Sequence, residues 1–385
     1  MGLMMPLVST MKWPPGHSPI TASPNPSTKI LGLDAIRFVC ALWVMMSHSG
    51  FLPHASQFLD KSVLVERILM SIYGLLFNGP AAVIVFFLIS GFCIHYPFRN
   101  ATDIPLAAFY ARRYLRIGIP MGVAMLLGAS LGVKYLILSL DTFVLTPEKI
   151  LTIAEVDTAI LWSLIAELIY YTLYPLLFRL RQRFGWGYLL AVSYLLAIPL
   201  ILLKADAKDF PSFGDGLNWV VGLPCWLLGC KLAEAIDCDR TLALNRGWIW
   251  GWRLGIWALA VIAKVLHYHH PPEFPWTGYP WTLNLFAIPC YFWLRREIAY
   301  ARSAPPFPVL EWAGKWSYAL YLMHTAGGLL WVAVTAAFSE LAQIGPFTDW
   351  ALKIIFTLCL CYLFHLLVEK PAHWLARRVA STLKR

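Results

Sequence analysis

The chain has 385 residues, of which 59% are hydrophobic and only 14% are charged. A soluble domain averages about 25% charged residues, so this composition excludes an ordinary soluble globular protein. The formal net charge is +10, but the basic residues are divided among many short connections, which argues against a nucleic-acid-binding surface. The eight cysteines lack the spacing of a metal finger or a disulfide framework, so we interpret them as packing residues and expect no metal site.

Apolar segments long enough to cross a bilayer recur along the whole chain, and each crossing needs roughly 20 residues. The sequence therefore predicts an all-α, polytopic integral membrane protein with about ten transmembrane helices. The predicted spans are 31–51, 70–96, 117–138, 158–178, 187–204, 217–234, 247–267, 281–299, 316–336 and 350–370.

The distribution of basic residues predicts the orientation of this bundle. About 22 Lys and Arg fall on the side that begins with the N-terminal tail, and about 8 fall on the other side. Basic residues concentrate in cytoplasmic loops. Both termini are therefore expected in the cytoplasm, which requires an even number of spans, and the expected location is a cell membrane.

The predicted spans divide the chain into three regions. Residues 1–30 are rich in Pro, Ser and Thr and have no continuous apolar core, which predicts a disordered cytoplasmic tail rather than a signal peptide. A docking peptide is the alternative for this tail. Residues 31–372 form the transmembrane domain, and residues 373–385 are expected to be a basic cytoplasmic tail.

The first predicted span, GLDAIRFVCALWVMMSHSG, carries Arg37 and His48 in an otherwise apolar helix. An ionisable residue inside a span costs about 2.5–3.5 kcal/mol, so it usually faces a cavity, a partner or a substrate. The two residues share one helix face and lie roughly 16 Å apart along the axis. Asp34, one turn before Arg37, is placed to pair with it. The pair predicts either an anion clamp with a proton-transfer group, or a snorkelling arginine with an interfacial histidine.

A basic cluster follows the second predicted span. Arg112, Arg113 and Arg116 lie in FYARRYLRIGIP, and arginine side chains match the geometry of phosphate oxyanions. Ordinary positive-inside anchoring is the alternative. Just upstream, Ser90 and Gly91 in FFLISGF permit a close approach of the backbone.

Two later spans carry further polar residues. Glu167 lies inside WSLIAELIYYTLYP with Ser163 about one turn away, and such a glutamate is costly unless it is protonated or paired. A structural link between helices is the alternative. In KWSYALYLMHT, Tyr318, Tyr321 and His324 recur every three residues and form a stripe that either lines a cavity or packs.

Two other segments receive less weight. The histidines of HYHH at 267–270 are interpreted as part of an interfacial loop rather than a metal site. LVEKPAHWLARR at 367–378 is interpreted as a terminal anchor with little catalytic importance.

Taken together and in this order, these segments resemble the acyltransferase-3 family of bacterial integral-membrane O-acyltransferases. The resemblance covers about 31–372, and one departure is that Ala35 and Phe38 stand where the family more often has glycines around the arginine. It implies transfer of an acyl group, usually acetyl from acetyl-CoA, to a hydroxyl of a surface or exported glycan. Some relatives acylate macrolides or peptides instead. The motifs are LDAIRF followed by His48, FFLISGF, RRYLRIGIP, WSLIAELIYYTLYP, SYALYLMH and VEKP.

The resemblance also implies roles for these residues. Acyl-CoA would be the co-substrate, with no permanently bound cofactor, and membrane lipid would surround the bundle. His48 would remove the proton from the acceptor hydroxyl. Direct transfer is favoured over an acyl-enzyme because no serine has a base adjacent in sequence. The donor would meet Arg37, Arg112, Arg113 and Arg116, Asp34 would orient Arg37, and Glu167, Ser90, Ser163 and Tyr321 would orient His48 or stabilise the oxyanion. The competing interpretation is a polytopic transporter or flippase, for which intramembrane Arg, His and Glu are also suitable.

Overall fold

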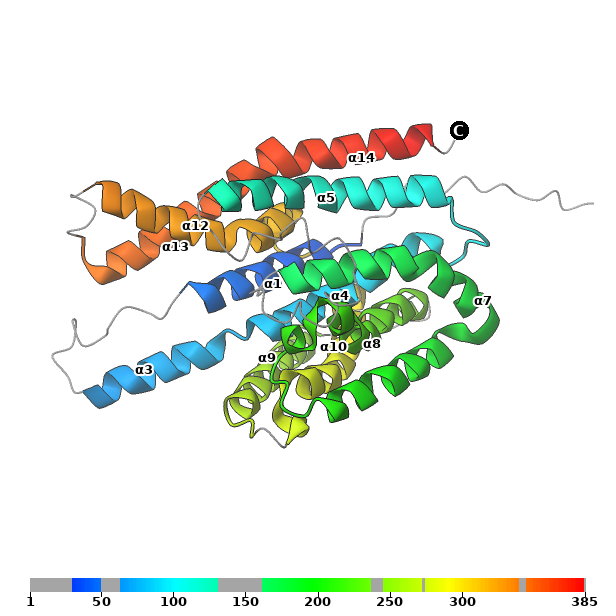
Figure 1. Cartoon of the computed structure of the whole chain (residues 1–385), viewed down its shortest axis with the longest axis horizontal. Helices are drawn as coiled ribbons and strands as arrows, with labels where there is room; N and C mark the ends of the chain where they lie inside the picture. The colour runs from blue at the N-terminus through cyan, green and yellow to red at the C-terminus, as the bar shows by residue number, and fades with distance from the viewer. Residues whose placement is uncertain are drawn as a thin grey trace, which may run out of the picture. The chain divides into compact units, whose positions relative to one another are not determined.

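The structure is a computed structural model of the 385-residue chain. It describes residues 30–49, 63–130, 161–236, 245–271, 274–338 and 344–383, so all but the last residue of the predicted 1–30 tail lies outside the described residues. Residues Leu31–Arg385 belong to one unit. All the regular secondary structure in the described ranges is helical, with no strand, which confirms the predicted all-α class (Figure 1).

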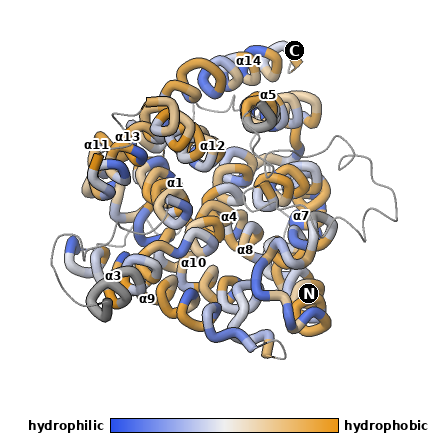
Figure 2. The backbone as a smooth tube through the Cα atoms, turned by 60° about the vertical axis from the view of Figure 1, so that its left-hand side comes forward, coloured by the Kyte–Doolittle hydropathy of each residue, from blue (hydrophilic) through white to orange (hydrophobic). Residues whose placement is uncertain are grey.

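Six helical segments in the described part of the chain are long and apolar enough to cross a membrane. Figure 2 shows apolar residues spread along most of the helices. The chain is therefore a polytopic membrane protein, while the count of ten spans and the cytoplasmic termini stay predictions. The elements are α1 (Leu33–His48), α3 (Val63–Leu76), α4 (Gly79–His95), η1 (Tyr96–Phe98), α5 (Leu106–Ser130), α7 (Leu161–Leu203), η5 (Phe210–Phe213), α8 (Gly214–Ala235), α9 (Arg246–Tyr268), η7 (Pro275–Thr277), α10 (Tyr279–Ser303), α11 (Pro308–Ala313), η8 (Gly314–Trp316), α12 (Ser317–Ala337), α13 (Pro346–Phe364), the π-helical turn η10 (His365–Glu369) and α14 (Lys370–Thr382).

The predicted span 70–96 is not one continuous helix. Asn78 separates α3 from α4, and its side-chain oxygen accepts a hydrogen bond from the backbone nitrogen of Ala81 at 3.1 Å. Pro80 occupies the first turn of α4, where its missing N–H costs nothing. The Asn78 amide also donates to the carbonyl of Ala260 at 2.8 Å. A capping asparagine in an apolar run therefore starts a new helix.

Two further boundaries differ from the predicted spans. Helix α5 begins at Leu106, so the arginines predicted to lie in a connection before residue 117 are on the helix itself. The predicted spans 158–178 and 187–204 correspond to α7, which is two helices joined at Gly185. Gly185 has φ 77°, a backbone conformation that residues with a side chain rarely adopt.

The predicted C-terminal tail is helical up to Thr382. It forms α14, which lies along α5 (Figure 1). Ala372, Ala376 and Ala380 are the buried residues of α14 and recur every four positions. Because residues four apart share a helix face, these small side chains allow the two helices to pack closely.

Helix α1 packs against α4 and α12, and its N-terminal end is held by α11 and η8. The Glu311 carboxylate accepts hydrogen bonds from the backbone nitrogens of Gly32 at 2.8 Å and Ala35 at 3.2 Å. A Cβ on Gly314 would overlap the backbone oxygen of Asp34. These contacts position the end of α1 that carries Arg37.

The predicted close approach at Gly91 is confirmed. A Cβ added to Gly91 would overlap the carbonyl of Trp226, and one added to Gly229 would overlap the carbonyl of Leu88. Helices α4 and α8 are therefore in backbone contact, and this contact brings Trp226 beside Ser90.

Candidate active site

His48, at the C-terminal end of α1, meets a second histidine. Its Nδ1 lies 2.9 Å from Nε2 of His324 on α12. The two rings are nearly parallel, with an interplanar angle of 17°. His48 is exposed, whereas His324 has only 3% of its surface accessible. Sequence reasoning identified His324 as part of a helix stripe but missed it as the partner of His48.

The next predicted residues lie deeper, between α4, α7 and α8. Ser90 Oγ donates to the Glu167 carboxylate at 2.5 Å, and the Tyr171 hydroxyl donates to the same oxygen. The indole nitrogen of Trp226 donates to Ser90 Oγ at 3.3 Å. Glu167 is therefore bonded to the Ser90 and Tyr171 hydroxyls, as a costly carboxylate in an apolar span must be.

Ser163 and Tyr321 connect this centre with the histidine pair. Their hydroxyl oxygens are 2.6 Å apart, joining α7 to α12. The Tyr321 ring lies 6.2 Å from the His324 ring, and Tyr321 is close enough to Glu167 to interact electrostatically. The hydroxyl groups thus form a polar line from Glu167 towards His48.

Arg37 and Arg113 converge at the opposite end of this line. Both lie close enough to Cys93 and Tyr171 to interact electrostatically with them, and Asp34 is within the same range of Arg37. Arg37 forms no hydrogen bond or ion pair with any residue in the described ranges. The buried Nε of Arg113 also has no hydrogen-bond partner there. Two guanidinium groups to which no carboxylate of the described residues is hydrogen-bonded are suited to an anionic ligand.

Arg116 extends the same cluster to α14. Its Nε donates to Nε2 of His373 at 3.1 Å. Glu369, only 1% accessible, accepts a hydrogen bond from Nδ1 of His365 at 2.8 Å, and its other oxygen lies 3.6 Å from Nε2 of His373. The VEKP segment, given little importance from its sequence, therefore supports the arginine cluster. The signals were the Glu369–His373 spacing of one helical turn and the π-helical turn, a feature frequent at functional sites.

Arg112 adds positive charge on the same helix as Arg113 and Arg116. Partial burial, Arg116 and Arg377 together lower the pKa of Arg112. Because Arg116 and Arg377 lower this pKa, these cations must lie close to Arg112 at this end of α5. An anion bound here would relieve that repulsion.

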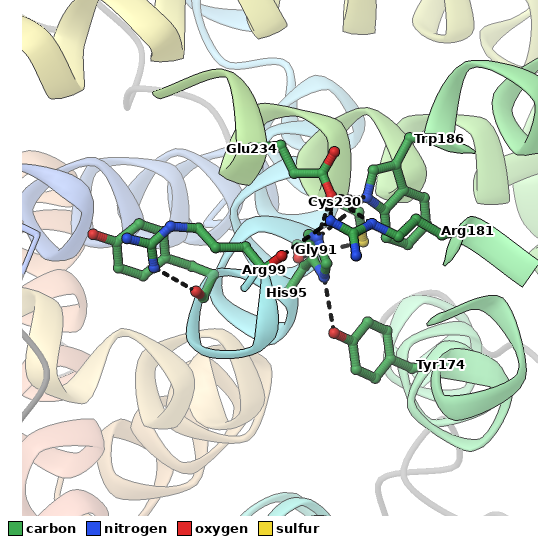
Figure 3. A network of polar contacts seen from close by, with 9 residues as sticks. Gly91, His95, Arg99, Tyr174, Arg181, Trp186, Cys230 and Glu234 are labelled. Carbon is green, nitrogen blue, oxygen red and sulfur yellow. Dashed lines mark hydrogen bonds and ion pairs between the residues drawn. The ribbon is translucent and has the colours of Figure 1, made fainter. Parts of the chain in front are cut away.

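A second buried polar network lies elsewhere, where α4 meets α7 and α8 (Figure 3). His95 is fully buried, with Nδ1 2.9 Å from the Tyr174 hydroxyl and Nε2 3.0 Å from the Glu234 carboxylate. The same Glu234 oxygen accepts from Trp186 at 3.0 Å and from Arg181 Nε at 2.6 Å. Both nitrogens of this histidine are occupied, so the network is a link between helices.

The HYHH segment makes packing contacts in the structure. The ring of His267 stacks on Tyr279 at 4.0 Å, and His270 Nδ1 lies 3.0 Å from Thr277 Oγ1. Within the described ranges, no group of three or more His, Cys, Asp or Glu is placed to hold a metal ion.

Comparison with known proteins gives two matches. A protein described as Nodulation protein 10, from Rhizobium leguminosarum bv. viciae, is 22% identical over 369 residues, which cover 88% of this chain and 92% of that protein. No solved structure matches. The family Acyl_transf_3, described as an acyltransferase domain, matches residues 30–366. This match spans the first helix, the histidine pair and the arginine cluster, and the chain belongs to this family of acyltransferases.

Proposed function

We propose that the protein transfers an acyl group, most simply acetyl, from acyl-CoA to a hydroxyl of a surface or exported glycan. One observation carries this proposal. The same helix, α1, presents an arginine that no carboxylate of the described residues hydrogen-bonds near one end and a paired histidine at the other. This arrangement suits a long anionic donor whose reactive group lies far from its charges.

The donor end is formed by the arginines. The phosphate groups of CoA would bind Arg37, Arg113 and Arg116, with Arg112 adding positive potential. Asp34 would orient Arg37, and His373 would orient Arg116 by accepting a hydrogen bond from its Nε. The pantetheine arm would then follow α1 over the roughly 16 Å that separate Arg37 from His48.

The chemical step is a direct acyl transfer. His48 takes the proton from the acceptor hydroxyl as its oxygen attacks the thioester carbonyl and forms the new C–O bond. The tetrahedral oxyanion then collapses, the C–S bond breaks, and the CoA thiolate takes the proton from His48. The reaction therefore consumes one acyl-CoA and one hydroxyl and yields one ester and one CoA thiol.

The hydroxyl groups that lie between the arginines and the histidine pair would stabilise the oxyanion. Tyr321 and Ser163 lie beside the histidine pair and can donate a hydrogen bond to developing charge. Ser90 and Glu167 lie further from His48, in their own hydrogen-bonded centre. There they would hold the Tyr171 side chain in place. Among the described residues, Glu167 is the one base bonded to Ser90. The contact is compatible both with positioning of Glu167 by Ser90 and with activation of Ser90 as a nucleophile.

The test uses the full-length protein in proteoliposomes, with [¹⁴C]acetyl-CoA and glycan extracted from bacterial membranes. We expect release of CoA thiol together with label esterified to the glycan, and loss of both in His48→Ala. Label on a peptide or macrolide added in place of glycan would retain the enzyme class and change the acceptor. Movement of substrate across the bilayer with no ester formed would overturn the proposal in favour of a transporter.

A further inference from the structure

The hydrogen bonds of His324 determine which of its nitrogens carries the proton. Its Nδ1 lies 2.8 Å from the carbonyl oxygen of Tyr321 and 3.2 Å from that of Leu320. A carbonyl oxygen can only accept, so Nδ1 must carry the hydrogen. In the neutral ring the lone pair is then on Nε2, the atom that faces His48.

The same reasoning extends to His48. Its Nδ1 lies 2.9 Å from Nε2 of His324, and this contact is a hydrogen bond only if one of the two atoms carries a proton. Because Nε2 of neutral His324 is an acceptor, Nδ1 of His48 is the donor. His48 is thereby left with its lone pair on Nε2, for which the described residues offer no hydrogen-bond partner.

We propose that His324 is a positioning residue that holds His48 in the tautomer whose Nε2 accepts the proton of the acceptor hydroxyl. This inference rests on the proposed acyl transfer and adds a residue that acts only through His48. The backbone carbonyl of Val44 also lies within hydrogen-bonding range of the His48 ring. Loss of the acceptor at Nε2 of His324 would therefore weaken the preference for this tautomer and raise the population of the form protonated at Nε2, which cannot remove a proton.

The pair can also share the proton that His48 receives. When His48 becomes an imidazolium, its Nδ1–H bond to His324 becomes charge-assisted and shortens. If the shared proton moves to His324 Nε2, His48 still carries hydrogen on its own Nε2 and can deliver it to the CoA thiolate as the shared proton returns from His324 to Nδ1 of His48. Lys264 of α9 is a cation close enough to interact electrostatically with His48, and its Nζ donates to the Phe77 carbonyl at 2.6 Å.

Substitutions at position 324 separate positioning from packing. In His324→Ala the acceptor is lost, and we expect kcat to fall about 100-fold with KM for acetyl-CoA within about twofold of wild type. In His324→Gln the side-chain oxygen can accept from His48 and the amide can donate to the Tyr321 carbonyl, so kcat should recover to within about tenfold of wild type. Glutamine and alanine with equal kcat would overturn the inference.

His269 supplies a matched control. Its Nδ1 lies 2.9 Å from the carbonyl of Val265, the same contact to a preceding turn that His324 makes, but within the described ranges its ring bonds no second histidine. His269→Ala should leave kcat within about twofold of wild type. A loss in His269→Ala equal to that in His324→Ala would show that removing any such histidine impairs the fold, and would contradict the inference.

A spectroscopic measurement tests the tautomer without substrate. Solid-state ¹⁵N NMR of histidine-labelled protein in bilayers, assigned with His48→Ala and His324→Ala, should show both rings protonated at Nδ1 and unprotonated at Nε2. In His324→Ala the His48 signal should include the Nε2–H form. A wild-type His48 protonated at Nε2 overturns the inference even if acyl transfer is confirmed. If NMR shows the expected tautomers but the protein performs no acyl transfer, the proposed function is rejected and the tautomer assignment stands.

Discussion

Two histidine centres in the described part of the chain, one around His95 and one around His48, differ in how fully their hydrogen bonds are used. At the centre around His95, both ring nitrogens have protein partners, and Glu234 collects three donors on one oxygen (Figure 3). At the centre around His48, one nitrogen bonds His324 and the other has no partner among the described residues. A fully bonded buried network rigidifies the helices that it joins. A reactive nitrogen left open is available to a substrate.

The arginines show the same contrast. Arg253 binds both oxygens of Glu297, at 2.6 and 3.0 Å, and Arg181 binds Glu234 at 2.6 Å. Arg37 and Arg113, by contrast, have no carboxylate bonded to them in the described part of the chain. A charged group without an ionic partner is expensive in an apolar bundle. The comparison therefore supports the proposed binding role of Arg37 and Arg113 and a structural role of Arg181 and Arg253.

The largest expected effect comes from removing the open histidine. His48→Ala should lower kcat for acyl transfer by about 10²–10⁴-fold, the usual contribution of a positioned general base. Its apparent unfolding temperature in detergent should change little, because His48 is exposed at the end of α1. The rate of thiol release from acetyl-CoA measures the first effect. Transfer near the wild-type rate would remove His48 from the mechanism.

The next effect separates the two kinds of arginine. Arg37→Ala should raise KM for acetyl-CoA by about 10–100-fold, because a hydrogen bond to a charged group contributes about 1.5–3 kcal/mol. Arg253→Ala is the matched control and should leave that KM unchanged while lowering stability. Initial rates at varied acetyl-CoA concentration give both values. An unchanged KM in Arg37→Ala would favour a snorkelling arginine.

A third variant tests the closed network by its stability. Glu234→Ala removes the acceptor shared by His95, Trp186 and Arg181. We expect a loss of about 1–2 kcal/mol in the free energy of unfolding, because buried donors are left unsatisfied. Thermal unfolding in detergent measures this loss, and kcat per folded molecule should stay within about twofold of wild type. A large fall in kcat without loss of stability would place this network in the catalytic machinery.

The smallest effect distinguishes direct transfer from an acyl-enzyme. Ser90→Ala removes one hydrogen bond to Glu167 and should lower kcat about fivefold, since one such bond contributes about 1 kcal/mol. Ser163→Ala is the parallel variant beside Tyr321. Loss of all activity in either variant, with label trapped on the wild-type serine by [¹⁴C]acetyl-CoA, would replace direct transfer by a covalent intermediate.

The helical membrane class was predictable because apolar length is a property of single segments. The errors arose where a boundary depends on a few atoms. Asn78 interrupts an apolar run by capping α4, and α5 begins eleven residues before the predicted apolar span. Hydropathy averaged over a window of 18 or more residues does not resolve a single capping residue or the first residue of a helix. The alanines of α14 at four-residue spacing suggested a packed helix only once α5 lay beside them.

The candidate site was predictable in its residue types. Arg37 and His48 were informative because an ionisable side chain in an apolar helix must have a compensating partner or ligand. Their neighbours were less visible. His324, Glu369 and His373 occupy the last third of the chain, and no local pattern relates them to a helix that begins at Leu33.

By itself the sequence determined that the protein is a helical membrane bundle, and that one helix carries an arginine and a histidine on one face. Helical periodicity and the cost of charge in lipid are sufficient for both conclusions. Only the tertiary structure decided which histidine is fully bonded and which is open, and which arginines lack a carboxylate. These distinctions depend on hydrogen-bond geometry between residues as far apart as 48 and 324, a separation that no pattern in the chain encodes.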